Sequence, residues 1–100
     1  MSHSATIQVA CSAIAAGWQC AVDVDDGASS GRHIVTVAAD DAERLAVARG
    51  QADVERLVYE AFDFLLDREP RSSILAEFDL PVVASYFPEF DAEMTRRLRP

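Results

Sequence analysis

The chain has 100 residues, of which 50% are hydrophobic and 26% charged, and its formal net charge is −8. This length and composition are typical of one globular domain, so we expect residues 1–100 to form a single domain. The acidic excess argues against non-specific nucleic-acid binding and against binding to anionic membranes, because both need a basic surface.

Alternation of apolar with polar or small residues predicts two strands, at residues 5–12 and 18–25. A four-residue loop at 14–17 would join them as a hairpin and place Cys11 opposite Cys20. A slip of one residue would set apolar side chains against polar ones, so this register is favoured. The other apolar pairs are Ala13 with Trp18, Val9 with Val22, and Ile7 with Val24.

The two cysteines have three interpretations. We favour a structural pair of buried thiols, with a disulfide or redox pair as the second interpretation and a metal site as the third. The first basic residue is Arg32, so no charged region of a secretory signal precedes the apolar stretch 9–22. We therefore expect a cytoplasmic protein with reduced thiols.

The segment 25–31, DDGASSG, is the strongest turn signal, and a third strand is expected at 32–39. A loop at 26–31 would place Asp25 opposite Arg32 as an exposed ion pair. The three strands form an antiparallel meander with one apolar face. That face consists of Ile7, Val9, Cys11, Trp18, Cys20, Val22, Val24, Val35 and Val37.

The longest apolar run with helical periodicity predicts a helix over residues 53–68, with Asp53 as its N-cap. More than half of its circumference is apolar, so it needs cover on two sides. We expect the meander on one side and the C-terminal segment on the other. The main stripe consists of Val54, Leu57, Val58, Ala61, Phe64 and Leu65.

Short helices are expected on either side of this long helix. A capping-box pattern at Asp40–Glu43 begins one at 41–48, and Gly50 is expected to stop it. The other short helices are expected at 73–78, 80–86 and 89–98. The sequence therefore predicts an α+β fold with a three-stranded meander packed on a long helix.

The patterns that could indicate chemistry are weak. Asp23, Asp25 and Asp26 resemble a calcium loop, but the glycine comes one residue early for an EF-hand. His33 near Ser29 and Ser30 lacks the elbow motif of a serine nucleophile. A metal set could be drawn from His3, Cys11, Cys20 and His33, but Cys-x8-Cys is not a zinc spacing. We therefore expect no enzyme activity and no cofactor.

Apolar residues at the predicted surface indicate a partner-binding patch instead. Its candidate residues are Ile34 on the outer face of the sheet and Tyr86, Phe87 and Phe90 around Pro88. A three-stranded sheet also leaves edges to which a partner can add. The expected partner is a second copy of the chain or another protein.

The segment 62–90 carries the runs REP, IL, FDL and YFPE, at Arg68–Pro70, Ile74–Leu75, Phe78–Leu80 and Tyr86–Glu89. It resembles a set of small bacterial proteins to which no activity is assigned. The order of three strands and a helix is also similar to the HicB-type antitoxin domains, although their glycine-rich turn is missing.

Three functions therefore remain open. The first is a cytoplasmic protein-binding or regulatory module without enzyme activity. The second is a small-molecule binder or enzyme, with a pocket between sheet and helices near Trp18, His33 and Tyr59. The third is a HicB-like, antitoxin-type partner of another protein.

Overall fold

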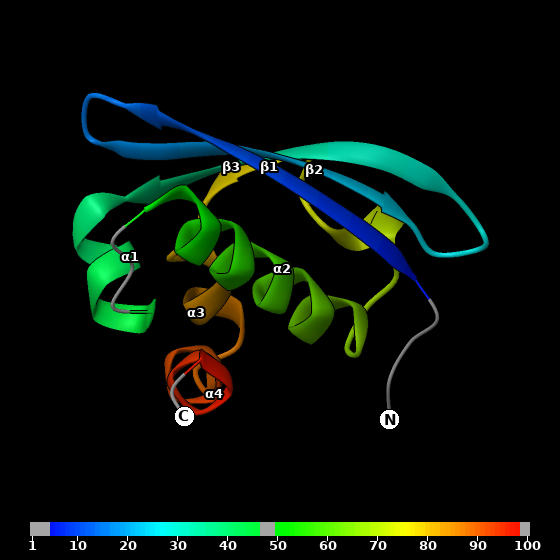
Figure 1. Cartoon of the computed structure of the whole chain (residues 1–100). Helices are drawn as coiled ribbons and strands as arrows, with labels where there is room; N and C mark the ends of the chain where they lie inside the picture. Colours follow the sequence, from blue (N-terminus) through cyan, green and yellow to red (C-terminus); the bar gives the residue numbers. More distant parts are fainter. Residues whose placement is uncertain (1–4, 47–49, 99–100) are drawn as a thin grey trace.

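The computed structural model describes residues 5–46 and 50–98. A four-stranded sheet forms one layer and the helices lie together on one of its faces, as Figure 1 shows. The predicted α+β class is confirmed, but the sheet has one strand more than expected. The elements in chain order are β1 (Thr6–Ile14), β2 (Gly17–Asp25), β3 (Ser30–Ala38), α1 (Ala39–Ala46), α2 (Gln51–Leu66), η1 (Arg71–Ser73), β4 (Glu77–Asp79), α3 (Val82–Tyr86) and α4 (Phe90–Leu98).

The predicted register of the first hairpin is confirmed. Strand β1 pairs with β2 so that Cys11 lies opposite Cys20 and Val9 opposite Val22. The connection is shorter than expected, because Ile14 and Gly17 already pair across it. Gly17 has a φ of +154°, and a Cβ there would lie 2.2 Å from the Val37 carbonyl oxygen. This position therefore requires glycine.

The predicted register between the second and third strands is wrong by two residues. Arg32 lies opposite Asp23 instead of Asp25, and their side chains form the exposed ion pair at 2.9 Å. The connection is tighter than expected because the Asp26 carboxylate accepts hydrogen bonds from the amides of Ala28 and Ser29. A shift of two residues keeps every side chain on its predicted face, so the buried face of the meander is unchanged.

The interpretation of the cysteines as free thiols is also wrong, since Cys11 and Cys20 form a disulfide. The Cys11 amide does not bond to β2; it donates to the Glu55 carboxylate at 2.9 Å. The two cysteines therefore occupy a non-hydrogen-bonded pair, in which facing side chains are closest. This geometry accounts for the bond.

Residues 73–78 do not form the expected helix. A single 3-10 turn, η1, is followed by β4, which pairs with β3 in parallel and places Phe78 beside Val35. The Ile34 amide donates to the Ala76 carbonyl at 2.8 Å, and the Leu80 amide donates to the Thr36 carbonyl at 2.9 Å. These bonds to β3 favour the extended conformation over the helix that the spacing of Ile74 and Phe78 predicts.

The other helices lie close to their predicted positions. The long helix α2 begins at Gln51, with Gly50 as its N-cap, so the prediction of Asp53 as N-cap is wrong. The end of the prediction for 41–48 falls outside the described residues. In the described part of the chain, no helix combines the length and the apolar character needed to cross a bilayer.

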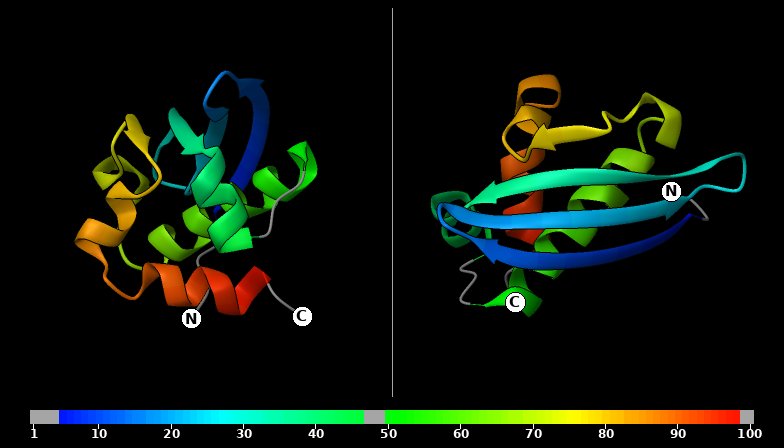
Figure 2. Two further views of the ribbon diagram at one scale, coloured as in Figure 1. Left: turned by 90° about the vertical axis from the view of Figure 1, so that its left-hand side faces the viewer. Right: turned by 90° about the horizontal axis from the view of Figure 1, so that it is seen from above.

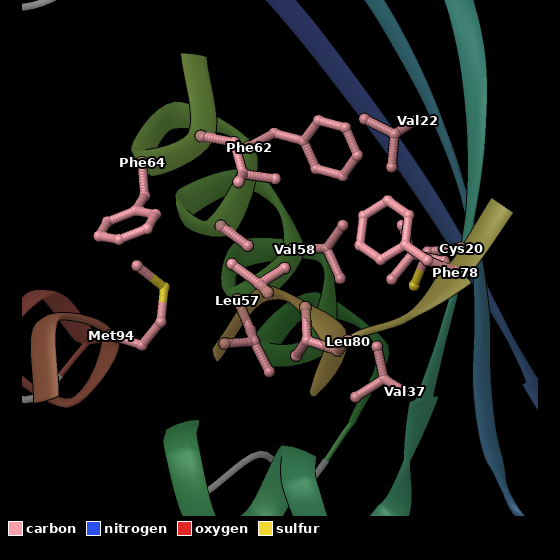
Figure 3. Packing of buried hydrophobic residues seen from close by; sticks show 14 of the residues in the cluster. Cys20, Val22, Val37, Leu57, Val58, Phe62, Phe64, Phe78, Leu80 and Met94 are labelled. Carbon is pink, nitrogen blue, oxygen red and sulfur yellow. The ribbon is translucent and has the colours of Figure 1, made fainter. Parts of the chain in front are cut away.

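Helix α2 lies diagonally beneath the meander, and Figure 2 shows this crossing from above. Its buried residues face the sheet on one side and α4 on the other; Phe62, Phe64, Leu57 and Met94 are all fully buried. Figure 3 shows Phe62 of α2 pointing toward the sheet, Phe78 of β4 pointing from the sheet toward Phe62, and Phe64 pointing toward Met94. The expected cover on two sides of the helix is therefore present.

An arginine of helix α4 forms ion pairs with helix α2. Arg97 has a side chain only 16% exposed, and it pairs with Glu93 at 2.8 Å, Asp63 at 2.9 Å and Glu60 at 3.2 Å. The hydrogen bonds from Arg96 and Arg97 lower the pKa of Glu93 to about 2. The basic C-terminal run is therefore used, in large part, for internal ion pairs.

Candidate functional site

The strongest candidate site is an apolar groove beside β4, with a volume of about 350 Å³. It lies between the end of α2, the segment that follows it, and α3. Figure 2 shows β4 outside β3, and Figure 1 shows α3 below the sheet, in the helix layer. The lining residues are Leu65, Glu69, Ser73, Ile74, Leu75, Phe78, Val82, Val83, Tyr86 and Phe87.

Two large apolar side chains in this lining are exposed to solvent. Tyr86, at the end of α3, is 68% exposed, and Leu75, just before β4, is 49% exposed. Ile74 is turned into the core and is only 7% exposed, so its neighbour Leu75 is turned outward. Burial of both exposed side chains by a partner would be favourable, because apolar area removed from water stabilises a complex.

A buried histidine holds the backbone of this segment in place. The Nδ1 atom of His33 lies 2.7 Å from the Leu75 carbonyl oxygen. A carbonyl can only accept, so Nδ1 carries the proton and donates it. The ring is 1% exposed and packs against Phe62, with ring centroids 5.3 Å apart. The His33 side chain thus connects β3 to the segment that carries Leu75 in the groove wall.

The wall at the far end of the groove is aromatic. Phe87 meets the ring of Phe64 edge to face, with centroids 5.8 Å apart. The Arg68 guanidinium lies 3.5 Å above the Phe64 ring, donates to the Phe64 carbonyl and pairs with Glu89 at 3.6 Å. These contacts fix Phe87 and leave its half-buried ring as a rigid surface.

The charged group in the lining is a carboxylate. Burial raises the pKa of Glu69 above its ordinary value. Two more acidic residues, Glu77 and Asp79, stand exposed on β4. Among the described residues, none of these three carboxylates forms an ion pair with an arginine. The groove therefore combines an apolar lining with an excess of negative charge.

The structure brings together only two of the four residues proposed for the patch. Tyr86 and Phe87 line the groove. Phe90 is 1% exposed and packs on Phe64 in the core, with centroids 5.4 Å apart, so its side chain is not a surface residue. Ile34 is half-buried on β3 and is not part of the lining.

The groove is not the pocket expected near Trp18, His33 and Tyr59, because none of these three residues lines it. Nor do the acidic turn residues or the histidine form a metal site: in the described part of the chain, no three His, Cys, Asp or Glu side chains are placed to hold an ion. The Asp26 carboxylate is used instead to accept amides of its own turn and the Arg71 amide.

Several lining residues were not expected from the sequence, notably Leu65, Leu75 and Val82. Leu75 was assigned to a helix, in which it would have covered α2. The signal that could have identified Leu75 as a lining residue is the adjacent apolar pair Ile74–Leu75, because so short a segment cannot bury the side chains on both of its sides.

Comparison with protein-family models, curated proteins and solved structures finds no match to this chain.

Proposed function

We propose that the protein is a binding module without enzyme activity and that its groove receives an apolar segment of another protein. The observation that carries this proposal is the pair of exposed side chains, Leu75 and Tyr86, in an otherwise apolar groove. Tyrosine is enriched among the residues that dominate binding energies, because it buries a large rigid surface at a small entropic cost.

A small apolar molecule with a cationic group is the second candidate occupant. The groove volume of about 350 Å³ is within the range of small-molecule pockets, roughly 300–1,000 Å³. The Glu69 carboxylate in the wall is the group that would pair with the cation. We favour a protein segment because Tyr86 is 68% exposed, and a small ligand would leave most of that ring in water.

The test is site-specific crosslinking in cells of the native host. A photoreactive amino acid is placed at Tyr86, and in a separate variant at Tyr59, which is also exposed, at 43%, but lies on α2 outside the groove. We expect position 86 to crosslink to one protein, identified by mass spectrometry, and position 59 not to do so.

The same partner must then respond to groove variants. Binding by the purified partner should be lost in Tyr86→Asp and in Leu75→Asp, because each places a charge in the apolar contact. Tyr59→Asp is the matched control and should bind as the unmodified protein does. Equal crosslinking at 86 and 59, or binding that survives both groove variants, would refute the proposal.

Two further expectations remain predictions. One is the cytoplasmic location, and the other is an antitoxin-type role as the partner of a toxin. The identity of the crosslinked protein bears directly on the second.

A further inference from the structure

The open edge of β4 lies beside the groove, and its backbone is arranged to accept another strand. The bonds between β3 and β4 use the Ala76 carbonyl and the Leu80 amide, and Phe78 is the residue between them. In a parallel ladder, the residues that alternate with these point their amides and carbonyls the other way. The backbone groups of Glu77 and Asp79 therefore face away from β3, where the described sheet has no further strand.

The two faces of this edge differ in character. Phe78 points to the helix side, where it lines the groove. Glu77 and Asp79 are exposed and, by the alternation of the strand, lie on the opposite face. A strand added here would place every second side chain over the groove and the others beside the two carboxylates.

The negative charge around the β4 edge indicates which kind of strand would bind there. The chain has a net charge of −8, and Glu77, Asp79 and Glu69 lack an ion pair within the described residues. Arg68, near the far end of the groove, is already engaged by Glu89 and the Phe64 ring. A second copy pairing through the same edge would bring its own Glu77 and Asp79 against these, and like charges across a sheet are unfavourable.

We propose that the partner binds as an extended strand on β4, with alternate apolar side chains in the groove and alternate Lys or Arg side chains beside Glu77 and Asp79. This inference rests on the proposed function and adds the form and charge of the bound segment. It is strand addition, in which the backbone gives affinity and alternate side chains give specificity.

The probe is a labelled peptide of about seven residues that alternates valine and lysine, compared with one that alternates valine and glutamate. Fluorescence anisotropy with the full chain should detect the lysine peptide. The glutamate peptide should bind at least about tenfold more weakly. No binding of the lysine peptide up to about 1 mM would overturn the proposal.

Two variants test the carboxylates. Glu77→Gln with Asp79→Asn should weaken binding of the lysine peptide by about fivefold to tenfold, because two cross-strand charge pairs are removed. The matched control is Glu43→Gln with Asp40→Asn, both exposed on α1 and outside β4 and the groove lining, and it should bind within about twofold of the unmodified chain.

Amide hydrogen exchange tests the backbone pairing directly. Binding should slow exchange at Glu77 and Asp79, whose amides would become paired. If Tyr86→Asp abolishes binding but the amides stay unprotected and the charge variants bind normally, the groove is a binding site and strand addition is wrong. If the amides are protected and Tyr86→Asp still binds, the edge pairs a strand and the proposed function of the groove is wrong.

Discussion

The two edges of the sheet are protected against strand pairing in different ways. At the middle of β1, which has nine residues, the Cys11 amide already donates to Glu55 of α2, and a disulfide joins this residue to β2. Strand β4 has three residues, and the exposed residues on it, Glu77 and Asp79, are acidic. Short length and charge are both common means of preventing strands from pairing at random.

This difference shows which edge can select among incoming strands. A side chain that occupies a backbone amide excludes every incoming strand at that point, whatever its sequence. Two carboxylates exclude an acidic strand, including a second copy of this chain, but attract a basic one. The groove beside β4 adds a place for apolar side chains. Of the two edges of the described sheet, the β4 edge is therefore the one that has unpaired backbone groups and can also distinguish between partner strands.

The largest expected effect is a loss of stability when the buried side chain that follows β4 is shortened. Leu80 is fully buried and follows β4 directly, so Leu80→Ala should lower the free energy of unfolding by about 2–5 kcal/mol. Urea unfolding followed by circular dichroism measures this loss. Leu75→Ala is the matched control; Leu75 is 49% exposed, and the change should stay within about 0.5 kcal/mol. Equal losses in the two variants would contradict the burial that distinguishes them.

At the opposite edge, the disulfide should give the next largest effect. It closes a short loop, with a sequence separation of 9, and the loss of loop entropy in the unfolded chain corresponds to about 2–3 kcal/mol. Reduction should therefore lower the urea midpoint of the unmodified protein. A variant with Cys11→Ser and Cys20→Ser should be insensitive to reductant. Identical midpoints with and without reductant in the unmodified protein would show that the bond contributes nothing.

The same two edges show how far the sequence could predict this fold. The hairpin of β1 and β2 was predicted with its register, because a one-residue slip would turn Val9 and Cys11 to solvent. The offset of two residues at Arg32 was missed because alternation has a period of two and cannot distinguish registers that differ by two. The hydrogen bonds within the turn, among them those to the Asp26 carboxylate, select the shorter connection.

Strand β4 could not be found from local pattern. Three residues are too few to show alternation, and Ile74, Leu75 and Phe78 have spacings that also suit a helix. The strand forms because it can pair with the edge of β3. The paired residues Val35 and Phe78 are 43 positions apart in the sequence. Tyr86 and Phe87 were proposed for a surface patch on their apolar character alone, and both line the groove. Phe90 has the same character but is buried beside Phe64.

The smallest expected effect concerns the carboxylate that closes β1. The hydrogen bond from the Cys11 amide, followed by that from Gln51, holds the pKa of Glu55 below its ordinary value of 4.5. A carboxyl whose pKa is lower in the folded chain stabilises the fold above the unfolded pKa, and this contribution is lost as the pH falls through the folded pKa. Glu55→Ala should therefore lower the free energy of unfolding by about 1 kcal/mol at pH 7 and by less below pH 4.5.

The Glu55→Ala variant also tests, separately from stability, whether Glu55 keeps the edge of β1 from pairing. In Glu55→Ala the Cys11 amide is no longer occupied, so the middle of β1 becomes available to a second copy. Light scattering after size exclusion should show more self-association than in Glu43→Ala, where an exposed glutamate of α1 is removed. If both variants remain as monomeric as the unmodified protein, Glu55 is not what protects this edge, and the length and twist of β1 must be enough to do so.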